Sequence, residues 1–417
     1  GMTKTINLNN PLFQTAMPLL EAIESHGYEA YFVGGCVRDA LLGKEIHDID
    51  IATSATPDEI QGIFPVTFDV GKKHGTIVVV YKKENYEITT FRTEGTYSDR
   101  RRPDQVNFVR NLREDTLRRD FTINALALDR LGRVYDYHGG EQDLQAGIIR
   151  AVGTALERFD EDALRMMRAL RFASQLGFEI ESQTFEAIGQ LAPNLSYVSI
   201  ERIRIELSKL AQGDYLGTSY KALTKSGLCA YLLGMEQVDA LAVWRQVYKT
   251  LAAQIAAGVA RDERLVWWAL VKALGLNSAR ARAFLRDWKH SNPFIKDVSD
   301  LLELDQAFAS GPLDAWQLYQ MPAHVLAIYE TYAYHQAWLS QPHQLTQAKA
   351  QLPLASRSDL AINGQKVMEA LGLSRGNAGL GRLLLELERQ VVMGDLANDP
   401  AGLLAQAQAL GADYLES

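Results

Sequence analysis

Short apolar segments of strand type alternate with helical segments in the N-terminal part of the chain. Residues 30–33 (Ala-Tyr-Phe-Val) predict a short buried strand, and residues 37–42 predict the helix that follows it. Residues 76–81 and 86–91 are rich in β-branched and aromatic side chains, which predicts a hairpin joined by residues 82–85. The pattern therefore predicts an α/β domain at this end of the chain.

Helical periodicity replaces the strand pattern after residue 155. At 417 residues the chain is too long for one ordinary hydrophobic core, so we expect an α+β protein with more than one domain. The predicted parts are an α/β domain over residues 2–155 and helical segments over residues 156–225, 226–310 and 311–417. Four tryptophans are the expected core anchors of the packed helices: Trp244, Trp267, Trp268 and Trp288.

Two adjacent glycines, Gly34 and Gly35, stand between the first predicted strand and its helix. They predict a tight turn at which backbone N–H groups approach a phosphate. Asp48 and Asp50 follow, interleaved with apolar residues as in a half-buried strand. Because alternate residues of a strand point to one face, we expect the two carboxylates to hold metal ions against a triphosphate.

This glycine turn is not a Walker-type phosphate loop, because Gly-x-x-x-x-Gly-Lys-Ser/Thr occurs nowhere in the sequence. Gly-Gly-x-x-Arg-Asp at residues 34–39, followed by Asp-x-Asp, instead resembles the signature of the nucleotidyltransferase (polymerase beta) superfamily. The resemblance implies transfer of a nucleotide with loss of pyrophosphate. It also implies a third catalytic carboxylate on a neighbouring strand, and Glu87 is the candidate. An outward-facing strand glutamate is the alternative explanation of Glu87.

A second motif occupies residues 118–125 (Arg-Arg-Asp-Phe-Thr-Ile-Asn-Ala). It resembles the Arg-Arg-Asp-x-x-x-Asn-Ala motif of the class II tRNA nucleotidyltransferases. The resemblance implies that Arg119 contacts phosphate, that Asp120 contacts the ribose, and that Asn124 belongs to the same nucleotide site.

Residues 161–172 (Glu-Asp-Ala-Leu-Arg-Met-Met-Arg-Ala-Leu-Arg-Phe) predict one amphipathic helix, closed by Leu-Gly-Phe at residues 176–178. Its polar face has four charged residues that step around the axis by about 60° each: Asp162, Arg165, Arg168 and Arg171. The opposite half is apolar and is expected to face the core: Ala163, Met166, Met167, Leu170 and Ala173. A ladder of ordinary surface ion pairs is the alternative explanation of the charged face.

Glu-Asp-x-x-Arg at residues 161–165 resembles the base-reading motif of the bacterial CCA-adding enzymes, which implies that Asp162 and Arg165 read the Watson–Crick edge of the incoming base. A carboxylate accepts from the exocyclic amino group of cytosine or adenine, and a guanidinium donates to the adjacent ring acceptors. Uracil and guanine would place a carbonyl oxygen against Asp162. One such pair therefore admits CTP and ATP and rejects UTP and GTP without a nucleic-acid template.

The resemblance to the CCA-adding enzymes of Gram-positive bacteria extends over nearly the whole chain and is tightest over residues 30–180. It implies a polymerase beta-like head, a neck, a body and a tail that binds tRNA, which correspond to the four predicted parts. It also implies that Asp48 and Asp50 bind Mg²⁺. The implied nucleotide-binding residues are Gly35, Arg38, Arg119, Asp120, Asn124, Asp162, Arg165, Arg168 and Arg171. Residues 199–207 begin with Ser199 as a helix cap, and they resemble a further helix of the family that lies beside the nucleotide site.

The implied activity is stepwise addition of C, C and A to the 3′ end of tRNA from CTP and ATP. Three relatives share most of these residues and stay open as alternatives: a CC-adding enzyme, an A-adding enzyme and a poly(A) polymerase. A catalytically idle RNA-binding module is the alternative from another class, and retention of both Asp48 and Asp50 argues against it.

The formal net charge of −8 at first sight argues against an RNA partner. The local distribution of charge matters more, and seven arginines lie between Arg100 and Arg119. Residues 93–104 lack apolar periodicity and predict a mobile loop that includes three of them. A solvated loop is the alternative explanation of Arg100 to Arg102.

Two cysteines without metal-ligand spacing, Cys36 and Cys229, favour a reducing cytoplasm. The sequence shows no apolar run long enough to span a bilayer, so we expect no membrane partner. It indicates no particular protein partner, and it leaves a homodimer open.

Overall fold

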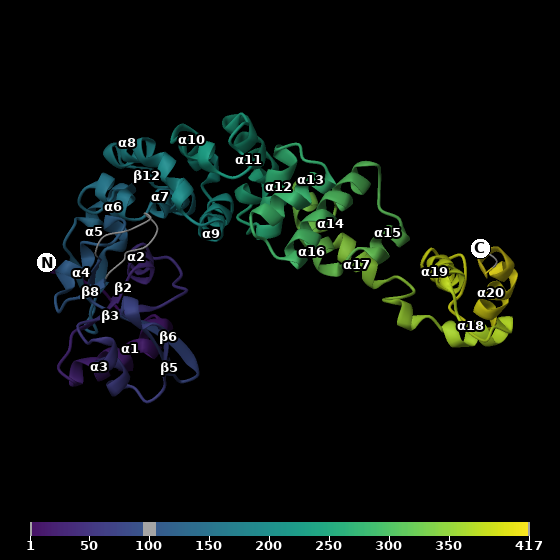
Figure 1. The fold of residues 1–417 in the computed structure, drawn as a ribbon, viewed down its shortest axis with the longest axis horizontal. Coiled ribbons are helices and arrows are strands. Elements are labelled where there is room, and N and C mark those ends of the chain that lie inside the picture. Colours follow the sequence, from purple (N-terminus) through teal and green to yellow (C-terminus); the bar gives the residue numbers. More distant parts are fainter. Residues whose placement is uncertain (1, 95–105, 416–417) are drawn as a thin grey trace. The chain divides into compact units, whose positions relative to one another are not determined.

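The structure, a computed structural model, describes residues 2–94 and 106–415. It divides into two compact units, of which the first ends at Tyr248 and the second begins at Lys249 (Figure 1). Most of the predicted loop over residues 93–104, with Arg100 to Arg102, lies outside the described residues.

The first unit begins with an eight-stranded sheet in the order β1-β10-β9-β2-β3-β6-β5-β4. Strands β3 and β6 run parallel, and their register places Asp50 beside Glu87. The neighbouring pairs in the rest of this sheet are antiparallel. The strands are β1 (Met2–Thr5), β2 (Ala30–Val33), β3 (Asp50–Thr53), β4 (Thr67–Gly71), β5 (Thr76–Tyr81), β6 (Glu84–Thr90), β9 (Leu126–Leu128) and β10 (Arg133–Asp136).

The predicted Asp-x-Asp strand begins later than expected, because β3 starts at Asp50 and Asp48 precedes it. The reason lies in the partner strand. β2 pairs with β3 from Val33 opposite Asp50, and the chain then leaves the sheet at Gly34, which has a φ of 77°. Only Asp50 of the two carboxylates is therefore in the sheet.

The predicted hairpin is confirmed with a tighter turn. β5 has the predicted bounds, but β6 starts at Glu84, so Lys82 and Lys83 alone form the turn instead of residues 82–85. Both lysines have positive φ, 50° and 67°, which suits the twist of a two-residue hairpin.

Helix α1 (Pro11–Ser25) shows how the head buries apolar surface. Asn10 caps it by accepting a hydrogen bond from the backbone N–H of Leu12. Its buried residues recur every three or four positions: Phe13, Ala16, Leu19, Leu20 and Ile23. The ring centroids of Phe13 and Phe32 lie 4.8 Å apart, so α1 packs against the central strand β2.

Short helices and a small ribbon complete the head. Strands β7 and β8 pair antiparallel and form a separate two-stranded sheet. α2 starts at Gly35, two residues before the predicted start at 37. The elements are α2 (Gly35–Leu41), α3 (Pro57–Ile63), β7 (Arg92–Glu94), β8 (Val106–Phe108), α4 (Leu112–Thr116), the 3₁₀ turn Thr122–Asn124 and α5 (Gly140–Ala146).

The rest of the first unit is helical, apart from two-residue strands β11 (Ile148–Ile149) and β12 (Glu179–Ile180), which pair parallel. α7 and α9 pack against each other, and α9 begins at Ile200 after the predicted Ser199, whose side chain makes no cap hydrogen bond. The helices are α6 (Ala155–Glu161), α7 (Leu164–Leu176), α8 (Ser182–Leu191), α9 (Ile200–Ala211) and α10 (Leu216–Lys225), and α11 (Ala240–Ala256) begins in the first unit and ends in the second.

The described part of the second unit contains helices and one 3₁₀ turn, Arg357–Asp359. The predicted core anchors Trp267, Trp268 and Trp288 are buried in it, and Trp244 is buried in the first unit. The rings of Trp267 and Trp288 meet edge to face at 5.3 Å. The helices are α12 (Glu263–Ala273), α13 (Ser278–Asp287), α14 (Asn292–Ala309), α15 (Ala315–Gln320), α16 (Ala323–His335), α17 (Gln344–Ala350), α18 (Gly364–Leu371), α19 (Ala378–Val392) and α20 (Pro400–Leu415).

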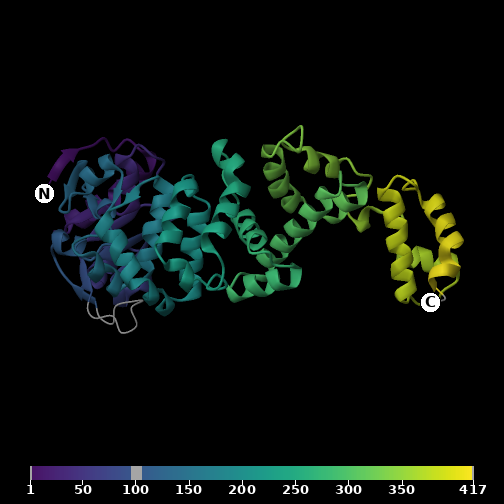
Figure 2. The ribbon, with the colours of Figure 1, turned by 90° about the horizontal axis from the view of Figure 1, so that it is seen from above.

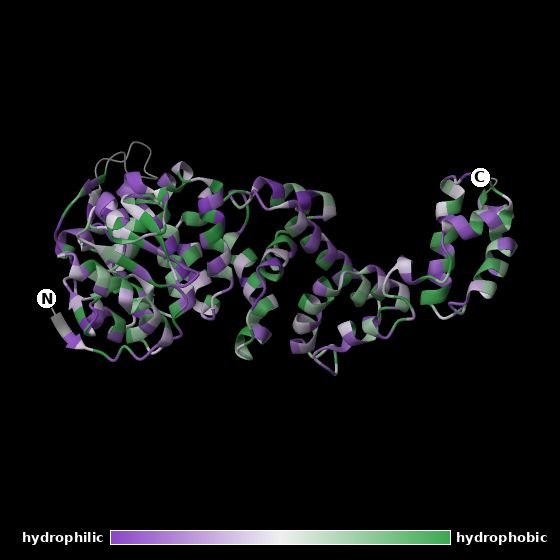
Figure 3. Cartoon of the chain, turned by 90° about the horizontal axis from the view of Figure 1, so that it is seen from below, coloured by the Kyte–Doolittle hydropathy of each residue, from purple (hydrophilic) through white to green (hydrophobic). Residues whose placement is uncertain are grey.

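Apolar and polar residues alternate along these helices (Figure 3). None of the helices among residues 2–94 and 106–415 is both long and apolar enough to cross a membrane.

Helices α18, α19 and α20 share one apolar core, and Figure 2 shows them together in yellow-green to yellow. Gly379 lies where α19 meets α20. A Cβ atom added there would lie 2.0 Å from the carbonyl oxygen of Tyr414. Helix packing therefore accounts for this glycine of the glycine-rich turn.

We predict that Gly379→Ala lowers the free energy of unfolding of the second unit by about 1–3 kcal/mol, because the new methyl group overpacks the helix contact. Gly381→Ala is the matched control, since a Cβ at Gly381 meets no atom within 4 Å. In the control the gain in helix propensity should stabilise by about 0.5–1 kcal/mol. Urea unfolding of the full chain measures both variants, and equal effects would contradict the packing explanation.

Candidate active site

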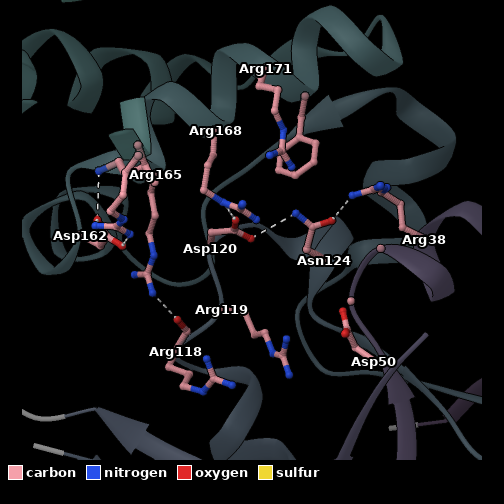
Figure 4. A pocket seen from close by; sticks show the side chains of 15 residues that line it. Arg38, Asp50, Arg118, Arg119, Asp120, Asn124, Asp162, Arg165, Arg168 and Arg171 are labelled. Carbon is pink, nitrogen blue, oxygen red and sulfur yellow. Dashed lines mark hydrogen bonds and ion pairs between the residues drawn. The ribbon is translucent and has the colours of Figure 1, made fainter. Parts of the chain in front are cut away.

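A cavity of about 400 Å³ lies in the first unit between the glycine turn, the 118–124 segment and helices α7 and α9 (Figure 4). Every predicted nucleotide-binding residue lines it, together with Asp50. Residues that the sequence analysis did not assign also line it: Gly34, Arg118, Leu164, Phe172 and Arg202. Seven arginines and three aspartates give the lining a formal excess of four positive charges, which suits a polyanion such as a triphosphate.

Asp50 belongs to this cavity and also to a neighbouring one of about 770 Å³, which Asp48 and Glu87 line as well. The parallel register of β3 and β6 explains the proximity of Asp50 and Glu87. The structure thus brings the three predicted carboxylates together, with Asp50 at the junction of the two cavities.

The electrostatic surroundings of Asp50 indicate that this cluster of carboxylates would bind a cation. Desolvation raises the pKa of its carboxyl, Glu87 and Asp48 raise it further, and Arg119 opposes them. The side chain of Asp50 is exposed, at the first residue of a strand whose next three residues are buried. Among residues 2–94 and 106–415, none of these three carboxylates has an ion-pair partner closer than 4.0 Å. A divalent cation would relieve this repulsion.

The protein alone does not provide a complete metal site in the part of the chain that the structure describes. No group of three or more His, Cys, Asp or Glu residues there has the geometry to hold a metal ion. Mg²⁺ commonly takes one or two protein carboxylates and completes its shell with water and substrate phosphates. The donor set at Asp48 and Asp50 fits an ion that arrives with a nucleotide.

A hydrogen-bonded chain crosses the floor of the cavity from Arg168 to Arg38 (Figure 4). The Nε–H of Arg168 donates to Oδ2 of Asp120 at 2.7 Å, and the Nδ2 amide of Asn124 donates to Oδ1 of Asp120 at 3.2 Å. Nη1 of Arg38 in turn donates to Oδ1 of Asn124 at 2.7 Å. The backbone N–H of Phe121 also donates to Asp120. Asp120 therefore holds its neighbours in place, and its contact with a ribose remains a prediction.

The ionisation of Asp120 reflects this chain. Burial alone would raise the pKa of its carboxyl, but the charges of Arg168 and Arg165 and the hydrogen bonds outweigh burial and lower the pKa to about 2. Asp120 is consequently a permanent anion at neutral pH, and it partly compensates the buried arginines.

Glu206 of α9 holds the far end of the arginine row. Nη1 of Arg171 donates to both of its carboxylate oxygens, at 2.8 and 3.1 Å, and Nη1 of Arg168 lies 3.7 Å from Oε1. The ring of Phe172 lies beneath three guanidinium groups, with centroid distances of 5.0 Å to Arg38, 5.2 Å to Arg168 and 4.3 Å to Arg171. Glu206 falls in the predicted helix over 199–207, but it lies 35 residues along the chain from Arg171, so the sequence gave no local signal of this contact.

Asp162 is not on the helix that the sequence predicted. α6 ends at Glu161, Asp162 is extended with φ −148° and ψ 105°, and α7 begins at Leu164. The break has a physical cause, because Oδ1 of Asp162 accepts the backbone N–H of Leu164 at 3.1 Å in the manner of a helix cap. The single amphipathic helix over 161–172 was therefore wrong at its first turn. Its predicted apolar half, from Ala163 to Ala173, is buried as expected.

The two predicted base-reading residues are held by other side chains. Nη2 of Arg202 donates to Oδ2 of Asp162 at 2.9 Å. Arg165 donates from Nη1 to Glu161 at 2.8 Å and from Nη2 to the carbonyl oxygen of Arg118 at 2.7 Å. Both groups are thus held by neighbouring side chains within the cavity, where they place an acceptor and a donor at the same end.

Three family profiles match successive parts of the chain. The profile described as "Poly A polymerase head domain" matches residues 30–150. The one described as "Probable RNA and SrmB- binding site of polymerase A" matches residues 177–240. The one described as "tRNA nucleotidyltransferase domain 2 putative" matches residues 260–407.

Individual relatives match over nearly the whole chain. The CCA-adding enzyme of Enterococcus faecalis is 43% identical over 396 residues, which covers 95% of this chain and 96% of the relative. That of Geobacillus stearothermophilus is 42% identical over 404 residues, covering 95% and 96%. The crystal structure of the Bacillus stearothermophilus CCA-adding enzyme in complex with CTP is similar with a TM-score of 0.81 at 37% identity, covering 98% and 99%.

We predict that Asp120→Asn lowers the free energy of unfolding of the first unit by about 2 kcal/mol at pH 7. Because the pKa of Asp120 is depressed in the folded state, its charge contributes stability above the unfolded-state pKa of about 3.9. That contribution is lost as the pH falls toward about 2.

Urea unfolding of wild type and Asp120→Asn at pH 7, 5 and 3 measures this difference. The gap in unfolding free energy should be the same at pH 7 and 5 and smaller at pH 3. A gap that stays constant or widens at pH 3 would show that Asp120 is not the stabilising anion described above.

Proposed function

The chain belongs to the family of the CCA-adding enzymes, and on this premise we propose that it adds C, C and A in turn to the 3′ end of tRNA. It uses CTP and ATP and releases pyrophosphate. One observation supports the proposal most: a single cavity joins an acidic junction at Asp50, a row of arginines, and a fixed pair of Asp162 and Arg165.

The arginine row is the part that binds the triphosphate. Arg38, Arg119, Arg168 and Arg171 line the cavity together, and their guanidinium groups neutralise the charge of the phosphates. The terminal 3′-hydroxyl of tRNA attacks the α-phosphorus, and the bond from that phosphorus to the pyrophosphate oxygen breaks. The arginines also counter the charge that develops on the departing pyrophosphate.

The acidic junction activates the attacking hydroxyl. Asp48 and Asp50 are the residues that would hold Mg²⁺, and the ion, when bound, stabilises charge on the attacking and leaving oxygens. Glu87, next to Asp50 across the two parallel strands, orients the hydroxyl or accepts its proton.

Selection of the base follows from the fixed pair. Arg202 holds the Asp162 carboxylate, which accepts from the amino group of cytosine or adenine. Arg165, anchored to Glu161, donates to the ring acceptors. A uracil or guanine carbonyl would meet the Asp162 carboxylate as acceptor against acceptor and be rejected.

The other predicted parts have supporting roles in this proposal. Residues 2–155 form the catalytic head, residues 156–225 the neck with the base-selecting helix, residues 226–310 the body, and residues 311–417 the tail that binds the distal part of tRNA. The boundary between the two compact units, at Tyr248, falls within the proposed body.

The state of the two cysteines is consistent with a reducing compartment. Cys36 and Cys229 are both free and buried, and burial raises the pKa of each thiol to about 12. We place the enzyme in the cytoplasm with its tRNA substrate.

Incubation of the protein with a tRNA that lacks its last three nucleotides, together with CTP, ATP and Mg²⁺, tests the proposal directly. The product on a sequencing gel should be three nucleotides longer. Products that stop at CC would identify a CC-adding enzyme. Extension only of tRNA that already ends in CC would identify an A-adding enzyme, and extension beyond three nucleotides would identify a poly(A) polymerase. Unchanged tRNA would leave only the idle RNA-binding module.

We predict that Asp48→Ala and Asp50→Ala each abolish CMP addition while tRNA affinity stays within about threefold of wild type. Losing a metal ligand removes stabilisation of charge formed in the transition state, which distant RNA contacts do not share. Single-turnover CMP incorporation and a tRNA filter-binding assay measure the two properties. CMP incorporation at the wild-type rate by either variant would refute the assignment of that residue to the metal.

We predict that Asp162→Ala relaxes selection against UTP and GTP, because it removes the rejecting carboxylate and leaves the metal site intact. Loss of one such base contact reduces discrimination by about 1–3 kcal/mol, roughly ten- to a hundredfold in the ratio of kcat/KM for CTP over UTP. An unchanged ratio would mean that Asp162 serves only as the cap of α7.

A further inference from the structure

Asp115 lies on α4, outside the cavity lining, and two contacts near the start of this helix hold the helix in place. Leu112 at the start of α4 packs in the cluster of Tyr31, Phe91 and their neighbours in the sheet. Asn111 caps the helix by accepting the backbone N–H of Glu114. Asp115 is consequently only 1% exposed, on an element that the head core holds in place.

Three donors converge on the Asp115 carboxylate. The backbone N–H of Arg92, at the start of β7, donates to Oδ1 at 2.9 Å. Nε of Arg118 lies 3.4 Å from Oδ1, and Nη2 of Arg119 lies 3.3 Å from Oδ2. Burial by itself would raise the pKa of Asp115, but the two arginines outweigh it and the pKa is lowered. A buried carboxylate is therefore balanced by two cations that both line the active-site cavity.

The two arginines connect Asp115 to opposite ends of that cavity. The charge of Arg119 acts on Asp50 at the acidic junction. The carbonyl oxygen of Arg118 accepts from Nη2 of Arg165 at the base-reading end. Displacement of residues 118 and 119 would therefore affect both the triphosphate and the base.

We propose that Asp115 is a positioning residue for nucleotide binding, which orients the Arg119 guanidinium toward the triphosphate without touching the nucleotide itself. The inference rests on the proposed function for the identity of the nucleotide. The competing explanation is a purely structural role, in which the carboxylate only anchors the backbone of Arg92.

Asp115→Asn separates the two roles, because asparagine keeps an oxygen acceptor for the Arg92 N–H but removes the charge that holds Arg119. Equilibrium binding of CTP in the absence of tRNA is the readout. We expect about tenfold weaker CTP binding, because a misoriented charged donor loses most of its contribution. On an Arg119→Ala background, the same substitution should weaken CTP binding by a clearly smaller factor, since only the contact through Arg118 is left to carry an effect.

Asp143→Asn is the matched control from the same head. Asp143 is also buried, accepts from Thr122 Oγ1 at 2.6 Å and pairs with Arg150 at 3.2 Å, but it lies outside the cavity lining. This substitution should lower the thermal midpoint as Asp115→Asn does and leave CTP binding within twofold of wild type. The comparison distinguishes loss of position from general loss of stability.

Two results would overturn the proposal: CTP binding unchanged in Asp115→Asn, or an equal loss in the wild-type and Arg119→Ala backgrounds. If Asp115→Asn does not fold, Asp115→Glu keeps the charge and shifts it by one methylene group. CTP binding at least threefold weaker is then expected, and unchanged binding would refute the role. The assay needs no tRNA, so failure of tRNA extension by the wild type would overturn the proposed function separately.

Discussion

Seven guanidinium groups share one small cavity, and their mutual repulsion is the constraint on which the rest of the site depends. An empty cluster of this kind is stable only if carboxylates are placed against it. Asp120 pairs with Arg168, Glu206 with Arg171 and Glu161 with Arg165. Three further aspartates complete the set: Asp115 beside Arg118 and Arg119, Asp162 beside Arg202, and Asp39 beside Arg38. Each pair fixes a donor before the nucleotide arrives, which is the arrangement that electrostatic catalysis requires.

The compensating carboxylates come from different elements, which ties the chemistry to the fold. Asp115 is on α4, Asp120 precedes the 3₁₀ turn, Glu161 ends α6 and Glu206 lies on α9. The pair of Asp120 and Arg168 joins the head to the following helices of the first unit, so both parts contribute to one site. Hydrogen bonds likewise hold Asp162 and Arg165, although Asp162 lies at a break between two helices.

Local sequence signals predicted much of this site because they are carried by adjacent residues. The apolar pattern predicted the strand Ala30–Val33 with its observed bounds, and the residues that the family resemblance assigned to the nucleotide all line one cavity. Partner choice was not predictable, because the pairs span 48 residues from Asp120 to Arg168 and 35 from Arg171 to Glu206. Spacing along the chain does not encode such contacts. The helix break at Asp162 was missed for a related reason. The 3.6-residue pattern of the sequence continues through the break, and the cause of the break is a side-chain hydrogen bond to the Leu164 N–H that the pattern does not reveal.

The central claim is that this preorganised cavity selects C and A by itself, without a template. The most direct test offers all four nucleoside triphosphates at equal concentration to the wild-type protein with tRNA lacking its last three nucleotides, and sequences the new 3′ ends. We expect ends that read CCA, with U and G rarer by at least tenfold at each position. Frequent U or G at any of the three positions would contradict it.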